Sequence, residues 1–348
     1  MNKNKRSVKP ILLTILAIIV AASILVPIPY YIERPGVPTH LNELVTVNGE
    51  QDDAEGSYSL TSVAIYQATV FQALKSKFEP FADLLSEKEL FGDATGEEYN
   101  QMQQYYMESS QNSAIEQALT LANKPFEFEF KGVYVMNVDP NSNFYHQISI
   151  GDTVTKVDGK QFESSPEFME YVQSQKVGDT VTITFLHDGV EKEATGELME
   201  LPTNKKAGIG ITLIDHTAIS SDESIEFHVE NIGGPSAGMM FTLQIYDQLT
   251  GNDLRQGRDI AGTGTMNLDG TIGRIGGIDK KIAGAVAAGI DIFFAPDDEI
   301  TAEMKEEYPG ILSNYEEAKQ VLEELDTEMV LVPVKTVKDA IDYLENNE

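Results

Sequence analysis

The alternation of apolar and polar positions divides the chain into an apolar start, a mixed region, a β-rich region and a region in which strands alternate with helices. Residues 11–26 carry no charged side chain, and apolar character continues through Ile32. A stretch of this length matches the roughly 20 residues that cross a bilayer. We therefore predict a transmembrane anchor over residues 10–32. Residues 1–9 contain four basic and no acidic side chains, which predicts a cytoplasmic tail and an extracytoplasmic remainder.

A cleaved signal peptide is the alternative interpretation of the same stretch. Its apolar core would cover residues 11–20, and the small residues Ala21 and Ala22 would form the cleavage site. Because the apolar run continues well past Ala22, we favour an uncleaved anchor. The expected protein crosses the cell membrane once, and the bulk of its chain lies outside the cytoplasm.

Residues 33–125 combine short strand patterns with helical ones. The strand patterns cover residues 43–47 and 58–61, a helical period follows over 63–78, and residues 97–121 favour one long polar helix. We find no grouping of nucleophiles, bases or metal ligands here. The prediction is an extracytoplasmic helical and extended region that packs onto its neighbours and carries no chemistry.

Residues 126–201 have the alternating pattern of a small β module. Strand patterns at 132–138 and 151–157 precede a helix with Ser165 and Pro166 at its start. A hairpin over residues 181–198 follows, and its turn contains an Asp-Gly pair. The module is therefore expected to be a compact sheet with one helix.

The run Gly-Asp-Thr-Val-Thr-Lys-Val-Asp-Gly at residues 151–159 resembles PDZ domains. In that family a peptide adds as a strand to the edge of the sheet. The resemblance implies a carboxylate-binding loop near Lys131 and Gly132, which are the candidate peptide-binding residues. The alternative is a β module that only spaces or regulates the next domain.

Residues 207–348 alternate strands and helices after a polar linker. Strand patterns occupy 208–213, 225–229, 260–266 and 290–295, and helical patterns occupy 239–249 and 279–288. A helix, a strand and a helix complete the chain after residue 313. The fold class that we expect for the whole chain is multidomain α+β, with this mixed α/β domain at its end.

Composition excludes several classes of function. The net charge of −31, from 56 acidic and 25 basic residues, argues against nucleic acid, which proteins hold mainly through Lys and Arg. The chain has no cysteine, so disulfides, thiolate catalysis and Cys-ligated zinc are excluded. We expect no metal and no cofactor.

One short motif offers a nucleophile. Residues 234–238 read Gly-Pro-Ser-Ala-Gly and match the nucleophile elbow of α/β-hydrolases, a fold in which the histidine follows the serine. The five histidines all precede Ser236. An earlier histidine, His216 or His228, could serve a triad of another order, but the alternation around His228 favours an ordinary strand residue.

Lysine is the base that remains. A lysine amine activates a serine hydroxyl only when it is neutral, and burial in apolar surroundings lowers its pKa from about 10.4 towards 7–8. Lys281 begins an apolar helix rich in Ala and Gly, which suits such burial. Lys280 is the alternative, and it lies on another face of the same helix.

Five blocks within residues 225–348 resemble the catalytic domain of Lon proteases. Together they are far more specific than any single motif. The resemblance implies Ser236 as nucleophile, Lys281 as general base and Thr263 as a hydroxyl that orients the amine. The blocks are Gly-Pro-Ser-Ala-Gly at 234–238, Leu-Thr-Gly at 249–251, Ala-Gly-Thr-Gly-Thr at 261–265, Gly-Arg-Ile-Gly-Gly-Ile-Asp-Lys-Lys at 273–281 and Ala-Gly-Ile-Asp at 288–291.

The chain departs from the Lon pattern next to the serine. Ile232 and Gly233 replace the usual Lys-Asp, and Thr265 stands where glutamate is common. Candidate oxyanion donors are the backbone N–H groups around the serine turn. They belong to Gly233, Gly234 and Ala237, because Pro235 has no N–H.

No P-loop accompanies these motifs. The order of anchor, PDZ and Lon-type domain resembles the YlbL-like membrane-anchored serine proteases of Gram-positive bacteria (peptidase family S16). It implies a serine endopeptidase without its own ATPase module. Its expected partners are peptides and proteins of the membrane or secreted pool, the cytoplasmic membrane, and further copies of itself in a homo-oligomer. The alternative is a catalytically vestigial, membrane-anchored peptide-binding scaffold.

Overall fold

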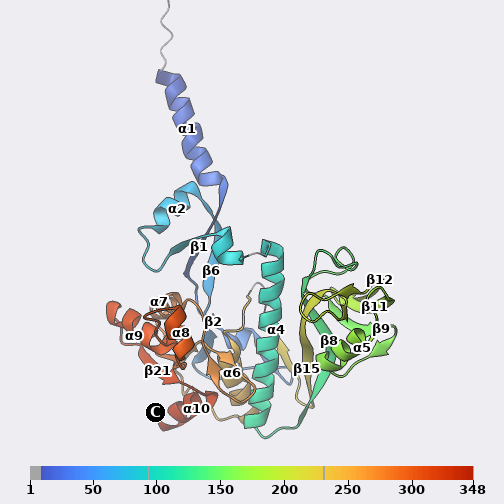
Figure 1. The fold of residues 1–348 in the computed structure, drawn as a ribbon. Coiled ribbons are helices and arrows are strands. Elements are labelled where there is room, and N and C mark those ends of the chain that lie inside the picture. The colour runs from blue at the N-terminus through green and yellow to red at the C-terminus, as the bar shows by residue number, and fades with distance from the viewer. Residues whose placement is uncertain (1–8, 93, 230–231, 348) are drawn as a thin grey trace, which may run out of the picture.

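The computed structural model describes residues 9–92, 94–229 and 232–347, so most of the predicted basic tail lies outside the described residues. Helix α1 (Lys9–Leu25) extends away from the rest of the molecule (Figure 1). Its apolar side chains are exposed, including Leu12 and Leu13 at 61% and 66%. Within the described ranges, no helix combines the length and the apolar character that crossing a membrane requires.

The predicted anchor over residues 10–32 is wrong in its second part. The helix ends at Leu25, and strand β1 (Pro27–Pro35) follows at once. Pro27 disfavours helical conformation at Val26 and lacks the N–H that a helix would need. β1 lies at the centre of an antiparallel sheet between β6 (Val63–Thr69) and β7 (Asp83–Ser86), beside the short helices α2 (Val70–Ser76) and α3 (Glu87–Phe91).

The Lon-like domain is built on a five-stranded sheet that takes strands from both ends of the chain. Its order is β2 (Thr39–His40), β5 (Ser57–Leu60), β17 (Asp259–Gly262), β20 (Ile292–Pro296) and β21 (Val330–Val334). β5 runs parallel to β17, with Tyr58 opposite Ile260. Residues 33–125 therefore supply part of this domain's sheet. We predicted a separate region that packs onto its neighbours, and the structure differs from that prediction.

Helices cover this sheet and complete its core. They are α4 (Gly96–Leu121), α6 (Gly238–Thr250), α7 (Ile278–Ala288), α8 (Ala302–Glu307), α9 (Asn314–Glu324) and α10 (Val337–Asn346). Leu60 of β5, Met107 and Ala118 of α4 and Met240 of α6 are buried in one hydrophobic cluster. Short pieces complete the domain: η1 (Leu41–Glu43), β3 (Val45–Val47), β4 (Glu50–Gln51), β16 (Ile225–Phe227), β18 (Thr265–Met266) and β19 (Ile272–Gly273).

The PDZ-like module is inserted between α4 and β16. Its main sheet has the order β12 (Val190–Glu197), β11 (Thr180–His187), β9 (Thr153–Val157), β8 (Phe126–Val138) and β15 (Ile211–Ser221), with β10 (Lys160–Gln161) beside β9. Helix α5 (Ser165–Ser174) and the pair β13 (Met199–Glu200) and β14 (Ala207–Gly208) complete the module. It has its own core, which includes Val133, Phe144 and Ile183. The mixed α and β class is confirmed.

In this module the structure differs from two of the predictions made from the sequence. β15 pairs with β8 over its whole length, so the strand predicted to open the Lon-like domain at 208–213 contributes to the PDZ-like sheet. Lys131 and Gly132 lie inside β8 and form no loop. A Cβ at Gly132 would lie 2.4 Å from the carbonyl oxygen of Val154, so glycine is needed there for close approach of β9.

Helix α4 stands between the two halves of the molecule (Figure 1). One side packs on α6 and the other on β15. Tyr105 Oη donates to the carbonyl of Asp215 at 3.1 Å, and Asn112 Nδ2 donates to the carbonyl of Thr217 at 2.9 Å. Both acceptors belong to the outermost strand of the PDZ-like sheet, so α4 connects that strand to the Lon-like domain.

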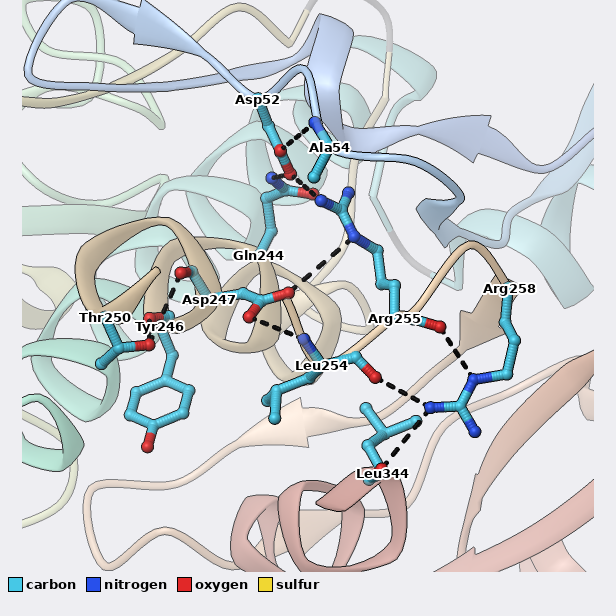
Figure 2. Close-up of polar contacts among 10 residues, drawn as sticks. All are labelled: Asp52, Ala54, Gln244, Tyr246, Asp247, Thr250, Leu254, Arg255, Arg258 and Leu344. Atoms are coloured by element: carbon cyan, nitrogen blue, oxygen red, sulfur yellow. Dashed lines mark hydrogen bonds and ion pairs between the residues drawn. The ribbon is translucent and has the colours of Figure 1, made fainter. Parts of the chain in front are cut away.

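A buried ion-pair cluster joins the segments before and after the module (Figure 2). Arg255 is 2% exposed, and its Nη2 lies 2.7 Å from Oδ2 of Asp52. Gln244 of α6 donates to the same carboxylate at 2.7 Å, and Asp247 Oδ2 is 3.8 Å from Arg255 Nε. The guanidinium also lies over the ring of Tyr58 in β5, 5.1 Å from its centre. The cluster thus fixes α6 to the amino-terminal strands.

Candidate active site

Ser236 lies on a tight turn at the amino end of α6. Gly234 has a φ of 91°, a conformation that glycine adopts without strain. The Ser236 carbonyl accepts from Gly264 N at 2.9 Å and from Thr263 Oγ1 at 3.1 Å. On the other side, Ser110 Oγ of α4 donates to the Pro235 carbonyl at 3.0 Å. The turn is therefore held both by the end of β17 and by α4.

Lys281 reaches this turn from the first turn of α7. Its Nζ lies 2.7 Å from Ser236 Oγ and 2.9 Å from Thr263 Oγ1. Lys281 is 3% exposed and Thr263 is fully buried, whereas Ser236 is partly exposed. The structure thus brings the predicted nucleophile, base and orienting hydroxyl together, with the hydroxyl of Ser236 accessible and the amine shielded.

Burial governs the charge of the Lys281 amine. It lowers the pKa of Lys281 from 10.5 to about 7, although the negative charge of Glu33 acts in the opposite direction. Burial disfavours the ammonium form because it removes water from a charged group. Near neutral pH, a large fraction of the amine is neutral and can accept a proton.

Lys280 has a different environment, although it is also buried. Its Nζ lies 2.6 Å from Asp83 Oδ2 and 3.1 Å from Asp279 Oδ2. Burial lowers the pKa of Lys280, but these carboxylates outweigh it and the net shift is upward. Lys280 is therefore a structural cation, and of the two lysines Lys281 is the one that contacts Ser236.

The predicted oxyanion donors differ from one another. The N–H of Gly234 donates to the carbonyl of Gln103 in α4 at 2.9 Å, so it is occupied in this conformation. Gly233 also lies against Gln103, where a Cβ would come within 2.7 Å of the Gln103 Cβ. Ala237 is the N-cap of α6, where the helix dipole favours negative charge. Its N–H is thus the best placed of the three.

The histidines considered as alternative bases have other partners. His216 Nδ1 lies 2.7 Å from Thr153 Oγ1, and its Nε2 lies 3.0 Å from Glu108 Oε1. His228 follows β16, and its backbone N–H bonds to Leu44. Among the described residues that line the cleft beside Ser236, none is a histidine, which agrees with a lysine base.

An open cleft of about 640 Å³ lies above Ser236 and Lys281. One wall comes from α4, through Tyr99, Gln103 and Met107, and another from Val63 and Ile65 of β6. Sequence reasoning missed these residues because it placed no chemistry in residues 33–125. The spacing of 99, 103 and 107 is four residues each time, which puts them on one helix face. That spacing was the available signal.

Two models of known families match this chain. The model of the Lon protease (S16) C-terminal proteolytic domain matches residues 216–344. These residues form a Lon-type proteolytic domain. A PDZ domain model matches residues 105–198, which include part of α4 and leave out β15. The chain thus combines a PDZ domain with the Lon-type domain.

Individual relatives agree with this assignment. Lon protease from Fusobacterium nucleatum is 43% identical over 65 residues, which cover 19% of this chain and 8% of that protein. Lon protease from Neorickettsia sennetsu is 28% identical over 110 residues, or 32% of this chain and 11% of that protein. The chain therefore spans about a tenth of the length of these curated relatives.

Among solved structures, the PDZ domain of an SdrC-like protein from Listeria monocytogenes is 40% identical. The match covers 25% of this chain and 90% of that chain, with a TM-score of 0.24.

Proposed function

We propose that the protein is a serine endopeptidase with Ser236 as nucleophile and Lys281 as general base. The observation that carries the proposal is the 2.7 Å contact between the Ser236 hydroxyl and a buried amine. The Lon-type domain around it supports the same chemistry. An open cleft beside the hydroxyl suits a polypeptide better than a small enclosed metabolite.

In the proposed mechanism, neutral Lys281 accepts the Ser236 proton while Oγ attacks the peptide carbonyl carbon. The tetrahedral intermediate collapses, the C–N bond breaks, and the leaving amine takes the proton from Lys281. Water then gives a proton to Lys281 Nζ and attacks the acyl-enzyme ester. As the ester C–O bond breaks, Lys281 returns that proton to Ser236 Oγ, which releases the acid and restores both Ser236 and the neutral amine. The N–H of Ala237 and the amino end of α6 stabilise the oxyanion.

Thr263 acts as a positioning residue in this proposal. Its single hydroxyl hydrogen is donated to the Ser236 carbonyl at 3.1 Å. Its oxygen can therefore only accept from Lys281, at 2.9 Å. When one N–H of the neutral amine is used in this way, the nitrogen lone pair is free to turn towards Ser236.

The reactivity of Ser236 is expected to depend on pH. Because Lys281 must be neutral to act and its pKa is about 7, labelling by a serine-reactive phosphonate should accelerate as pH rises through about 7. The rate of covalent labelling, followed by intact-mass spectrometry from pH 5 to 9, measures this. Absence of labelling at every pH would favour the vestigial scaffold.

Substrate and location complete the proposal. We infer that α1 attaches the protein to the cytoplasmic membrane with the proteolytic domain on its outer side. The exposed apolar side chains of α1 support the attachment. The basic residues before α1 support the orientation. Substrates would be membrane or secreted polypeptides, and the PDZ domain would engage them or control access. Cleavage would proceed without an ATPase module in this chain, in a homo-oligomer or a single copy.

Deletion of residues 1–26 is expected to release the protein from membranes, because it removes the apolar helix and leaves β1 intact. Immunoblots of membrane and soluble fractions, before and after a carbonate wash, measure the change. In intact spheroplasts, added protease should digest a carboxyl-terminal tag on the full chain. Protection of that tag, or a mature chain that begins at Ser23, would contradict the proposed anchor.

A further inference from the structure

Helix α4 carries a stripe of side chains that the proposed mechanism does not use. Asn100, Gln104, Glu108 and Gln111 recur at intervals of three or four residues and therefore lie on one face. With a wall formed by Val229, Ile232 and Gly233, they line a groove of about 800 Å³. The groove lies outside the PDZ sheet and shares part of its lining with the cleft at Ser236.

The groove is rich in neutral amides. Of its nine lining residues, four are Asn or Gln and one is charged, in a chain with 56 acidic residues. The charged residue, Glu108, is paired with His216 at 3.0 Å. The carboxamides of Gln104 and Gln111 make no hydrogen bond to another described residue. Each can donate and accept, which matches the N–H and C=O groups of a polypeptide backbone whatever its sequence.

The groove adjoins the catalytic cleft. Five residues line both, including Gln103, Met107 and Gly233. Its length also fits a peptide, because the stripe spans twelve residues of helix, whose ends are about 17 Å apart. An extended chain covers that distance with about five residues. At the far end, Glu108 and His216 join α4 to β15 of the PDZ domain.

We propose that this groove binds the extended substrate polypeptide on one side of the scissile bond, between Ser236 and the PDZ domain. The proposal rests on the proposed peptidase function and names its substrate contact. The amides of Asn100, Gln104 and Gln111 hold the backbone without selecting its sequence. A substrate that engages the PDZ domain thereby reaches Ser236 along α4.

The test compares two quenched fluorescent peptides with the same central sequence. A short one of about six residues occupies the cleft alone, and a long one extends it by about six residues on each side. Wild-type kcat/KM should favour the long peptide by about tenfold, since several backbone hydrogen bonds are added. The double variant Gln104→Trp, Gln111→Trp fills the groove and should remove this preference. Thr120→Trp, exposed on α4 away from the groove, should keep it.

Equal efficiency for both peptides in wild type, or an unchanged preference in the filled variant, would overturn the proposal. If a second copy of the chain covers the groove instead, filling it changes the mass measured by sedimentation and affects both peptides equally. Binding of the long peptide to Ser236→Ala, measured by fluorescence anisotropy, tests the groove separately from the proposed peptidase function. If the long peptide binds Ser236→Ala, does not bind the variant with the filled groove, and is not cleaved by wild type, the peptidase function is refuted and the groove proposal stands.

Discussion

Ser236→Ala and Lys281→Arg are each expected to abolish peptide hydrolysis. The first removes the nucleophile. The second keeps a positive charge at the site but cannot supply a neutral base, because guanidinium remains protonated in proteins. Since a nucleophile and its base act as a unit, each change should lower kcat by about 10⁴-fold or more. Release of amino groups from casein, at pH 8 and with purified full-length protein, measures the loss.

The neighbouring lysine provides the matched control. Lys280→Arg keeps the charge that pairs with Asp83 and Asp279, so the variant should retain most of its activity. Circular dichroism establishes that each variant is folded. Substantial activity in folded Lys281→Arg would refute lysine as the base, and in Ser236→Ala it would refute serine as the nucleophile.

Ser236 and Lys281 could be predicted because each has a local signal. Ser236 is marked by a glycine-rich turn before a helix, and Lys281 by its place at the start of a small-residue helix. Thr263 was indicated only by the resemblance to the Lon catalytic domain. What the sequence could not supply is their distances, which depend on the approach of α7 to α6 across the sheet.

The domain boundaries were harder to predict, because a strand pattern identifies which face is buried and not which strand is the partner. β5 pairs with β17, and the paired residues Ser57 and Asp259 are 202 positions apart in the sequence. β15 pairs with β8 across the whole PDZ insertion. The predicted anchor also extends past Leu25, although Pro27 and Pro29 disfavour a helix there.

The same long-range pairing explains why the wall of the cleft was missed. Residues 97–121 have the pattern of a solvated polar helix, and Glu97 and Glu108 are indeed exposed. Its inner face nevertheless buries Met107 and Ala114 in the core of the proteolytic domain. The contact of Gln103 with Gly234 places α4 directly against the serine turn. A polar helix with a narrow apolar stripe can therefore be part of an active site.

Arg255→Met is expected to destabilise the proteolytic domain by about 3–5 kcal/mol, the usual cost of removing one partner of a buried ion pair. Arg255 is 2% exposed, and the side chains of Asp52 and Asp247 are 7% and 3% exposed. Without the guanidinium, two buried carboxylates lose their counter-ion. The lost contacts join β5 and the segment after β4 to α6, so the serine turn should lose support as well. Urea unfolding followed by tyrosine fluorescence measures the change.

Lys338→Met is the control, because the Lys338–Asp342 pair is exposed and such pairs contribute little to stability. Adding Asp52→Asn to Arg255→Met should recover part of the stability, since it removes one unpaired charge.

The pH dependence of the cluster's contribution to stability follows from the pKa of Asp52. Burial raises its pKa, but hydrogen bonds from Arg255 and Gln244 outweigh this, and the net shift is downward. Its contribution to stability is therefore present above the ordinary aspartate pKa and is lost as pH falls below it. Equal stability of Arg255→Met and Lys338→Met would show that the cluster does not hold α6 to the amino-terminal strands.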